Sequence, residues 1–182
     1  MKKSRFLEIS SQLDLPFLET NGELIQKIFE TLRLKFRLIK NSNQKLIDLG
    51  SGNGQIIAHS ALNYGIKSIG IEINQNIIKE AKRHIKLLKK EKLYHRKLFR
   101  KIKVVHGDFY EIDLRDFDFI YIYSLPTMQK YLQHVFLTAK NRSIIISYKY
   151  PLNGFDSFLK LEFELKSEFK DKLISTFYYE KF

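Results

Sequence analysis

Apolar residues fall into short runs separated by polar turns, and the stretches between these runs repeat their apolar residues at helical spacing. A short apolar run bounded by turn residues is typical of a buried strand, whereas apolar residues three and four apart indicate a helix with one buried face. Alternation of the two predicts an α/β domain with a mostly parallel sheet. The runs predicted as strands cover residues 45–49, 67–72, 102–106, 118–123 and 142–148.

Helices are expected between these strands and before the first of them. Gly65 suits the end of the second helix, because glycine readily adopts the left-handed conformation found there, and Thr127 suits the cap of the last. The stretches predicted as helices cover residues 21–39, 55–64, 74–90 and 127–139.

The C-terminal part is expected to add an antiparallel pair of strands. Residues 157–166 and 172–180 carry the apolar pattern of strands, and residues 167–171 lie between them as the turn region. The chain length suits one domain with a proper core. We expect residues 41–182 to form that domain and residues 1–40 to supply a segment and a helix that pack on it.

A glycine-rich turn follows the first predicted strand. Gly50, Gly52 and Gly54 alternate through it, and Asp48 lies just before it. Glycine lets a ligand approach the main chain closely. The next strand ends in Glu72, about 20 residues further on, where dinucleotide-binding folds place the acid that binds the ribose. The pattern indicates a cofactor site, the alternative being a tight turn without a ligand.

The spacing of the glycines argues against a dinucleotide. The dinucleotide fingerprint is G-x-G-x-x-G, whereas this turn alternates glycines and carries Asp48 before them. A carboxylate there would repel a pyrophosphate and would suit a ligand with an ammonium group. A P-loop is excluded, because no Gly-Lys-Ser/Thr follows. Asp108 follows the third strand and also falls at the expected ligand edge, unless it merely forms a Gly-Asp turn.

The composition narrows the classes of function. The chain has no cysteine, and its five histidines lack the spacing of metal ligands, so we expect no metal site. No apolar run reaches the roughly 18 residues of a membrane span. We therefore expect no membrane association and a cytoplasmic location.

The net charge of +12 is concentrated in residues 79–103, the basic stretch, which holds twelve Lys and Arg against two Glu. Such a stretch is either a solvated helix face and loop or a docking surface for nucleic acid or an acidic partner. The sequence leaves both interpretations open.

The glycine turn resembles motif I of the class I S-adenosylmethionine (SAM) methyltransferases. The resemblance implies SAM as the cofactor and a Rossmann-like sheet of seven mostly parallel strands, closed by the antiparallel C-terminal pair. It implies that Glu72 holds the ribose and that Asp108 holds the adenine amino group. The cofactor-binding residues expected from it are Thr20, Asp48, Gly50, Ser51, Gly52, Gly54, Glu72, Ile73, Asp108 and Phe109.

Further motifs resemble those of the archaeal broad-specificity protein-lysine methyltransferases and their mitochondrial relatives. The matching motifs are Pro16-Phe17-Leu18-Glu19-Thr20, Asp48 to Gly54, Gly70-Ile71-Glu72-Ile73-Asn74 and Tyr123-Ser124-Leu125-Pro126. The resemblance implies methyl transfer to the ε-amino group of lysine in a protein. The chain departs from the group at Glu19, in the basic insertion near residues 90–101 and after Tyr150.

The chemistry of lysine methylation places demands on the site. A lysine nucleophile must be neutral, and at pH 7 only roughly one in 2,000 free lysines is. An apolar or aromatic channel lowers its pKa by desolvation, and ring faces hold the methylated cation. Tyr123, at the end of the fourth strand, is our candidate for the wall of that channel, its alternative being a tyrosine of the sheet end.

Other functions compete with this interpretation. Methyltransferases acting on adenine N6 or cytosine N4 end the fourth strand in Pro-Pro-Tyr/Phe, where this chain has Leu125-Pro126-Thr127. Methylation of RNA at another atom, methylation of a small molecule and a non-catalytic SAM-binding module remain as alternatives.

Overall fold

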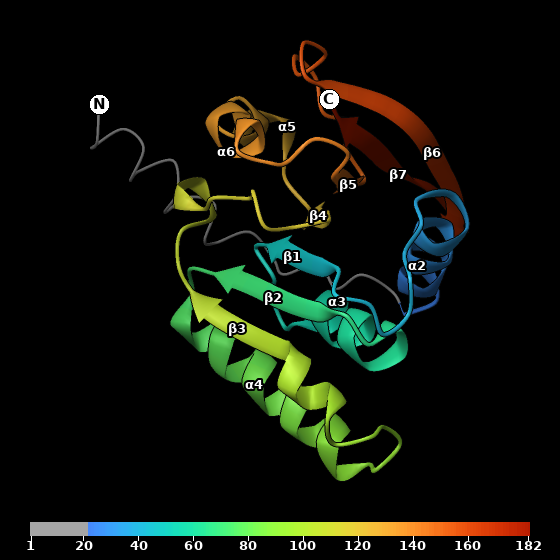
Figure 1. Ribbon diagram of the computed structural model, residues 1–182, viewed down its shortest axis with the longest axis vertical. Helices are drawn as coiled ribbons and strands as arrows, with labels where there is room; N and C mark the ends of the chain where they lie inside the picture. The colour runs from blue at the N-terminus through green and yellow to red at the C-terminus, as the bar shows by residue number, and fades with distance from the viewer. Residues whose placement is uncertain (1–21) are drawn as a thin grey trace.

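The sheet has seven strands in the order β3-β2-β1-β4-β5-β7-β6 in the computed structural model, which describes residues 22–182 (Figure 1). Strands β1 to β5 pair in parallel, and β7 pairs antiparallel with both β5 and β6. This arrangement confirms the predicted fold class. The strands are β1 (Lys45–Leu49), β2 (Lys67–Glu72), β3 (Ile102–His106), β4 (Phe119–Ile122), β5 (Ile144–Tyr148), β6 (Leu159–Phe169) and β7 (Lys172–Lys181).

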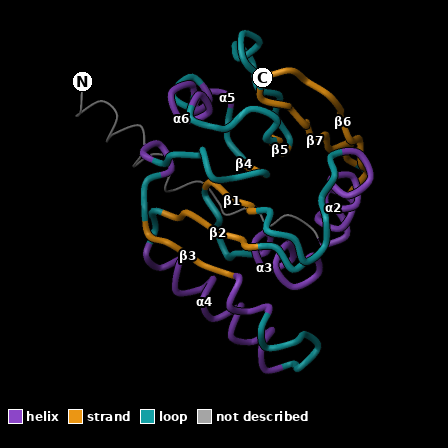
Figure 2. Tube along the Cα trace, viewed as in Figure 1, coloured by secondary structure: helices purple, strands orange, loops and turns teal. Residues whose placement is uncertain are grey.

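Helices connect the parallel strands and cover both faces of the sheet (Figure 2). Helix α2 precedes the sheet, and α4 is the longest helix of the described residues. A π-helical turn, η1 (Ser60–Tyr64), continues α3, and short 3₁₀ turns precede and follow β3. The helices are α2 (Gly22–Lys35), α3 (Gln55–His59), α4 (Gln75–Lys90), α5 (Pro126–Gln129) and α6 (Gln133–Leu137), and the 3₁₀ turns are η2 (Leu98–Lys101) and η3 (Phe109–Glu111).

The core is divided by the sheet into two apolar layers. On one face, α2 and α3 pack against side chains such as Leu46 and Tyr121. On the other face, α6 packs against side chains such as Ile47 and Ile120. Adjacent strand residues thus point to opposite layers, as they must in a strand buried on both faces.

Helix α2 ends at Lys35, four residues earlier than predicted. Its apolar face is buried as expected, but the backbone N–H groups of Phe36 and Leu38 both donate to the carbonyl oxygen of Leu32. Arg37 between them has a φ of 55°. The left-handed residue turns the chain out of the helical path, which stops the helix even where the apolar pattern continues.

The single helix predicted over residues 127–139 is wrong, because this segment forms the two short helices α5 and α6. Thr127 does not cap a helix, since Pro126 is already the first residue of α5 and Leu125 precedes it as the N-cap. Proline is favoured at that position because its missing N–H has no partner to lose.

The C-terminal hairpin is longer than predicted. Lys170 and Asp171 both adopt positive φ, at 48° and 57°, and form the tight turn between β6 and β7. Two such residues give the type I′ turn whose twist matches a hairpin. Within residues 22–182, no helix has the length and apolar character needed to cross a membrane.

Candidate active site

The candidate residues come together at the carboxyl ends of the parallel strands. The register pairs Leu49 with both Ile71 and Ile122, so β1, β2 and β4 end side by side. The chain therefore leaves β1 into the glycine turn directly beside Glu72 on one side and Tyr123 on the other. This edge is where open α/β sheets bind their ligands.

The glycine turn, Gly50 to Gly54, is fixed by hydrogen bonds to β2. The N–H groups of Gly50 and Ser51 each donate to the carbonyl oxygen of Ile71 at 2.9 Å. Glu72 accepts from the N–H of Gly52 at 3.1 Å through one oxygen and from Asn74 at 2.9 Å through the other. The turn is thus held in place by the protein itself, and Glu72 keeps lone pairs for further donors.

Asp48 is the most perturbed acid at this edge. Its side chain is 3% exposed and makes no hydrogen bond or ion pair with any residue among 22–182. Burial raises the pKa of Asp48 well above its ordinary value, and the nearby charge of Glu72 raises it further. Glu72 is also buried and has no cationic partner in the described chain. Two buried acids without a cation fit a positively charged ligand.

Phe109 and Asp108 close the other side of the turn. A Cβ placed on Gly50, whose φ is 83°, would lie 3.7 Å from the Phe109 ring, so this ring lies against the turn. One oxygen of Asp108 accepts from the N–H of Tyr110 at 2.9 Å and caps the following 3₁₀ turn. The turn-forming role considered from the sequence therefore exists, while the second carboxylate oxygen remains for a ligand.

Ser51 faces into the protein at this turn. Its Oγ is buried and has no hydrogen-bond partner in the described residues, and a Cβ on Gly70 would lie 2.5 Å from Ser51 Cβ. Ser51 thus packs on the glycine in the middle of β2. This contact explains why a central strand carries a glycine, which normally weakens a strand.

The other expected cofactor residues are placed less decisively. Ile73 follows Glu72 with its side chain 37% exposed, and its carbonyl oxygen contacts His106 Nε2 at 3.0 Å. Thr20, and the Pro16–Thr20 motif with it, lies outside the described residues. No group of His, Asp or Glu in residues 22–182 has the geometry of a metal site.

Tyr123 belongs to a group of tyrosines at the ends of β4 and β5. Its ring centroid is 5.4 Å from that of Tyr148 and 6.2 Å from that of Tyr150, whose ring is almost parallel. Lys149 Nζ lies 5.9 Å from the centroids of both Tyr123 and Tyr150. An ammonium group therefore already lies over these two rings, at the outer limit of a cation–π contact.

The backbone at Lys149 is strained. Its φ is 72°, and the N–H of Tyr150 donates to the carbonyl oxygen of Tyr148 at 2.9 Å across it. This is the rare γ-turn with positive φ, which persists only where surrounding contacts hold it. The Ser147 hydroxyl donates to the Tyr150 carbonyl oxygen at 2.6 Å and the Lys149 N–H to that of Ser175 at 2.8 Å, and both secure the turn.

Two residues near the site had no signal in the sequence. Gln129 Nε2, at the end of α5, is buried without a hydrogen-bond partner in the described part of the chain, as is Ser124 Oγ of the Tyr123–Pro126 motif. His84 of α4 contacts the carbonyl oxygen of Asn53 at 3.2 Å and so ties that helix to the glycine turn. A single glutamine and a single histidine on helices carry no spacing that sequence patterns recognise, and only the fold brings them here.

A family model described as the ANTKMT methyltransferase domain matches residues 48–158. The chain belongs to this family. The buried, cation-free acids and the constrained glycine turn fit the methyl donor of these enzymes, and the ANTKMT-domain protein is a SAM-dependent methyltransferase. The residues gathered at this edge that could hold SAM are Asp48, the glycine turn, Glu72, Asp108 and Phe109.

Solved structures show the same fold. An RNA methyltransferase from Salinibacter ruber, in complex with S-adenosyl-L-homocysteine, is 19% identical with a TM-score of 0.69, over 90% of this chain and 93% of that one. The m1A22 tRNA methyltransferase TrmK of B. subtilis is 18% identical with a TM-score of 0.67, over 91% of this chain and 68% of that one. Magnesium protoporphyrin IX methyltransferase from Synechocystis PCC 6803, with bound SAM, is 10% identical with a TM-score of 0.66, over 91% of this chain and 86% of that one. No curated protein matches the chain.

Proposed function

We propose that the protein transfers a methyl group from SAM to the ε-amino group of lysine in a protein substrate. The observation that carries this proposal is the ammonium of Lys149 over the rings of Tyr123 and Tyr150. A site that accommodates one lysine ammonium beside two aromatic rings is chemically suited to another. The family match and the lysine-methyltransferase motifs of the sequence agree with it.

The cofactor, when bound, supplies a methyl group activated on a sulfonium. The protein then has to align the acceptor nitrogen with that methyl and keep the nitrogen neutral. Tyr123 lies beside the glycine turn, because β4 pairs with β1 up to Ile122 and Leu49. When a substrate lysine binds over Tyr123, the rings displace the water around its amino group, and this desolvation favours the neutral form. After the transfer, the ring faces attract the methylated cation.

Asp48 and Glu72 bind the cofactor in this proposal, whereas Tyr123 and Tyr150 receive the acceptor lysine. Asp48 is buried and lies where the positively charged part of the cofactor would bind, which offsets the cost of its desolvation. Glu72 accepts hydrogen bonds and would hold the ribose hydroxyls. Glu72 also fixes Gly52, so the acid and the turn act as one unit.

The experiment compares Tyr123→Phe and Tyr123→Ala in methyl transfer to protein. We expect the Phe variant to keep activity within a few-fold, because it keeps the ring, and the Ala variant to lose tenfold or more in kcat/KM. The matched control is Phe169→Ala, which removes a ring under a lysine ammonium, Lys170, at the distant end of the β6–β7 hairpin. Wild-type rates in Tyr123→Ala would contradict the proposed role of the rings.

Methylation of RNA is the second candidate, and the basic stretch favours it. Two of the similar structures are RNA methyltransferases by name. The tyrosine rings could also stack on a base, but the lysine ammonium already over them favours a lysine acceptor, so we place RNA methylation second. A labelled product that nuclease destroys would decide for it.

A further inference from the structure

The basic stretch is exposed along the β3 edge of the sheet, from α4 to β3. Helix α4 carries Lys79, Lys82, Arg83, Lys86, Lys89 and Lys90, three or four residues apart, so they share the exposed side of the helix while Ile78 and Ala81 are buried. Five further exposed residues follow the helix. The basic surface comprises Lys79, Lys82, Arg83, Lys86, Lys89, Lys90, Lys92, Arg96, Lys97, Arg100 and Lys103.

The charge of this surface is not neutralised by the protein. None of its eleven side chains forms an ion pair with a residue among 22–182, whose ion pairs all lie elsewhere. The stretch contributes +10 of the total +12, which leaves +2 for the remaining 157 residues. The other 157 residues are almost balanced in charge, so the protein does not need a large positive charge to stay in solution. The excess in the basic stretch therefore points to an anionic partner.

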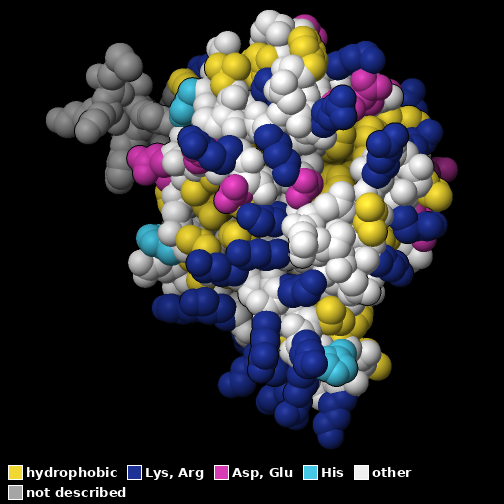
Figure 3. Space-filling model, viewed as in Figure 1, with side chains coloured by type: hydrophobic (Ala, Val, Ile, Leu, Met, Phe, Trp, Pro, Cys, Tyr) yellow, Lys and Arg dark blue, Asp and Glu magenta, His cyan; other side chains and the backbone are white. Residues whose placement is uncertain are grey.

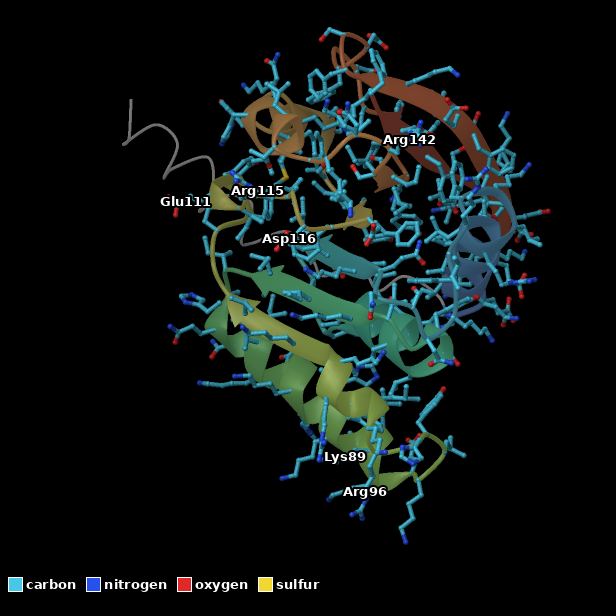
Figure 4. All side chains as sticks on the ribbon, viewed as in Figure 1. Lys89, Arg96, Glu111, Arg115, Asp116 and Arg142 are labelled. Carbon is cyan, nitrogen blue, oxygen red and sulfur yellow. The ribbon has the colours of Figure 1, made fainter. Side chains whose placement is uncertain are left out.

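The basic surface runs from the cofactor edge of the sheet to the opposite edge. Helix α4 starts just after Glu72 and ends 16 residues later, a length of about 24 Å. Figure 4 shows Lys89 and Arg96 together at the far tip, away from Glu111 near the carboxyl end of β3, and Figure 3 shows Lys and Arg gathered over that tip. The tip therefore docks a partner at a distance from the methyl-transfer site.

The tip also carries side chains suited to unstacked bases. Leu93 is 74% exposed, His95 is exposed, and the ring of Tyr94 is half-buried between them. Ring and apolar side chains set among cations are the pattern on which single-stranded nucleic acids bind, with phosphates on the cations and bases on the rings. An acidic polypeptide would use the cations and leave the rings without a purpose.

We propose that the basic surface is a docking site for single-stranded RNA, separate from the site of methyl transfer. RNA is the polyanion that cells present as long single strands, and a 24 Å stripe followed by a loop can follow its backbone over several phosphates. The role goes beyond lysine methylation and holds whichever substrate is methylated.

The test is binding of a fluorescently labelled 20-nucleotide single-stranded RNA to the full chain, followed by anisotropy from 50 to 200 mM KCl. Single-strand binding has a slope of log K against log[KCl] of about −0.7 for each phosphate contact. The variant K86Q/K89Q/K90Q/K97Q removes up to four contacts, so its slope should be less steep by about 2 to 3, and its affinity at 100 mM KCl should fall at least tenfold.

A control variant separates this surface from general charge. K27Q/R33Q/K170Q/K172Q removes the same charge from α2 and the β6–β7 hairpin, and it should bind RNA within about twofold of wild type. Both variants should bind SAM as wild type does, because none of these residues belongs to the cofactor edge. A failure of lysine methylation would thus not affect this result.

Three outcomes would overturn the proposal. The first is no RNA binding by the wild type at 50 mM KCl. The second is equal weakening by the two quadruple variants. The third is binding of polyglutamate or of a DNA duplex as tight as that of the RNA, which would assign the surface to an acidic protein or to duplex DNA.

Discussion

Ser51 of the glycine turn packs directly on Gly70 of β2, so closely that a Cβ on Gly70 would lie 2.5 Å from Ser51 Cβ. The turn can approach β2, and donate twice to the Ile71 carbonyl, only because Gly70 has no side chain. A residue in the middle of a strand thus sets the position of the cofactor turn.

Gly70→Ala should therefore damage both stability and cofactor binding. Overpacking in a core costs about 1–3 kcal/mol, which in a chain of this size lowers Tm by several degrees. Calorimetry of unfolding and titration with S-adenosyl-L-homocysteine measure the two effects. Gly107→Ala is the control, because its Cβ would meet Ile71 at an ordinary 3.6 Å. Equal behaviour of the two variants would mean that the turn tolerates displacement.

Asp48→Asn should stabilise the cofactor-free protein while weakening SAM binding. The pKa of Asp48 is raised in the folded state, so stability is lost as the pH rises from its ordinary value through the raised one. The Tm difference between variant and wild type should grow over that range and reach at least about 3 °C, the shift that 1 kcal/mol produces. Thermal melts from pH 4.5 to 8 measure it. A variant that is less stable at every pH would contradict the electrostatic account.

His59 should produce the opposite dependence on pH. Burial beside the rings of Phe29 and Tyr64 lowers its pKa to about 4 from an ordinary 6.5. Its contribution to stability is complete above pH 6.5 and is lost as the pH falls toward 4, at no more than about 1.4 kcal/mol per pH unit. Denaturant unfolding of wild type and His59→Gln at pH 7 and pH 5 should show this loss only in the wild type. The exposed His95→Gln should behave as the wild type does.

Lys149→Met should improve the use of protein substrates. Removing the resident ammonium frees the faces of Tyr123 and Tyr150, so KM for protein acceptors should fall several-fold with kcat within twofold. Steady-state methyl transfer at varied acceptor concentration measures the two constants. Lys40→Met, which removes an ammonium over Tyr64 on another part of the protein, should leave both unchanged. A higher KM in Lys149→Met would show that Lys149 helps to bind the acceptor instead.

Sequence patterns predicted the sheet well, because buried parallel strands are short apolar runs that end at glycine or an acid. The prediction for β2 agrees residue for residue. Helix ends were less accurate. The left-handed turn at Arg37 and the start at Pro126 depend on local backbone geometry rather than on apolar spacing.

The candidate site was predicted only as far as its motifs reach. Asp48, Glu72 and Asp108 end adjacent strands and meet at one edge, as parallel topology requires. The packing of Ser51 on Gly70, the contact from His84 to Asn53 and the strained turn at Lys149 join residues that no sequence spacing relates. The resemblance to SAM methyltransferases agrees with the family match, while lysine as the acceptor remains a proposal.

The most direct test of the central claim is transfer of a labelled methyl group from SAM to a cell extract by wild type and Tyr123→Ala. Samples are split for treatment with protease or nuclease, and the labelled material is hydrolysed in acid for amino-acid analysis. We predict label that protease releases and nuclease leaves intact, recovered as methyl-lysine, and at least tenfold weaker with Tyr123→Ala. Label that nuclease releases, with no methyl-lysine, would contradict the account.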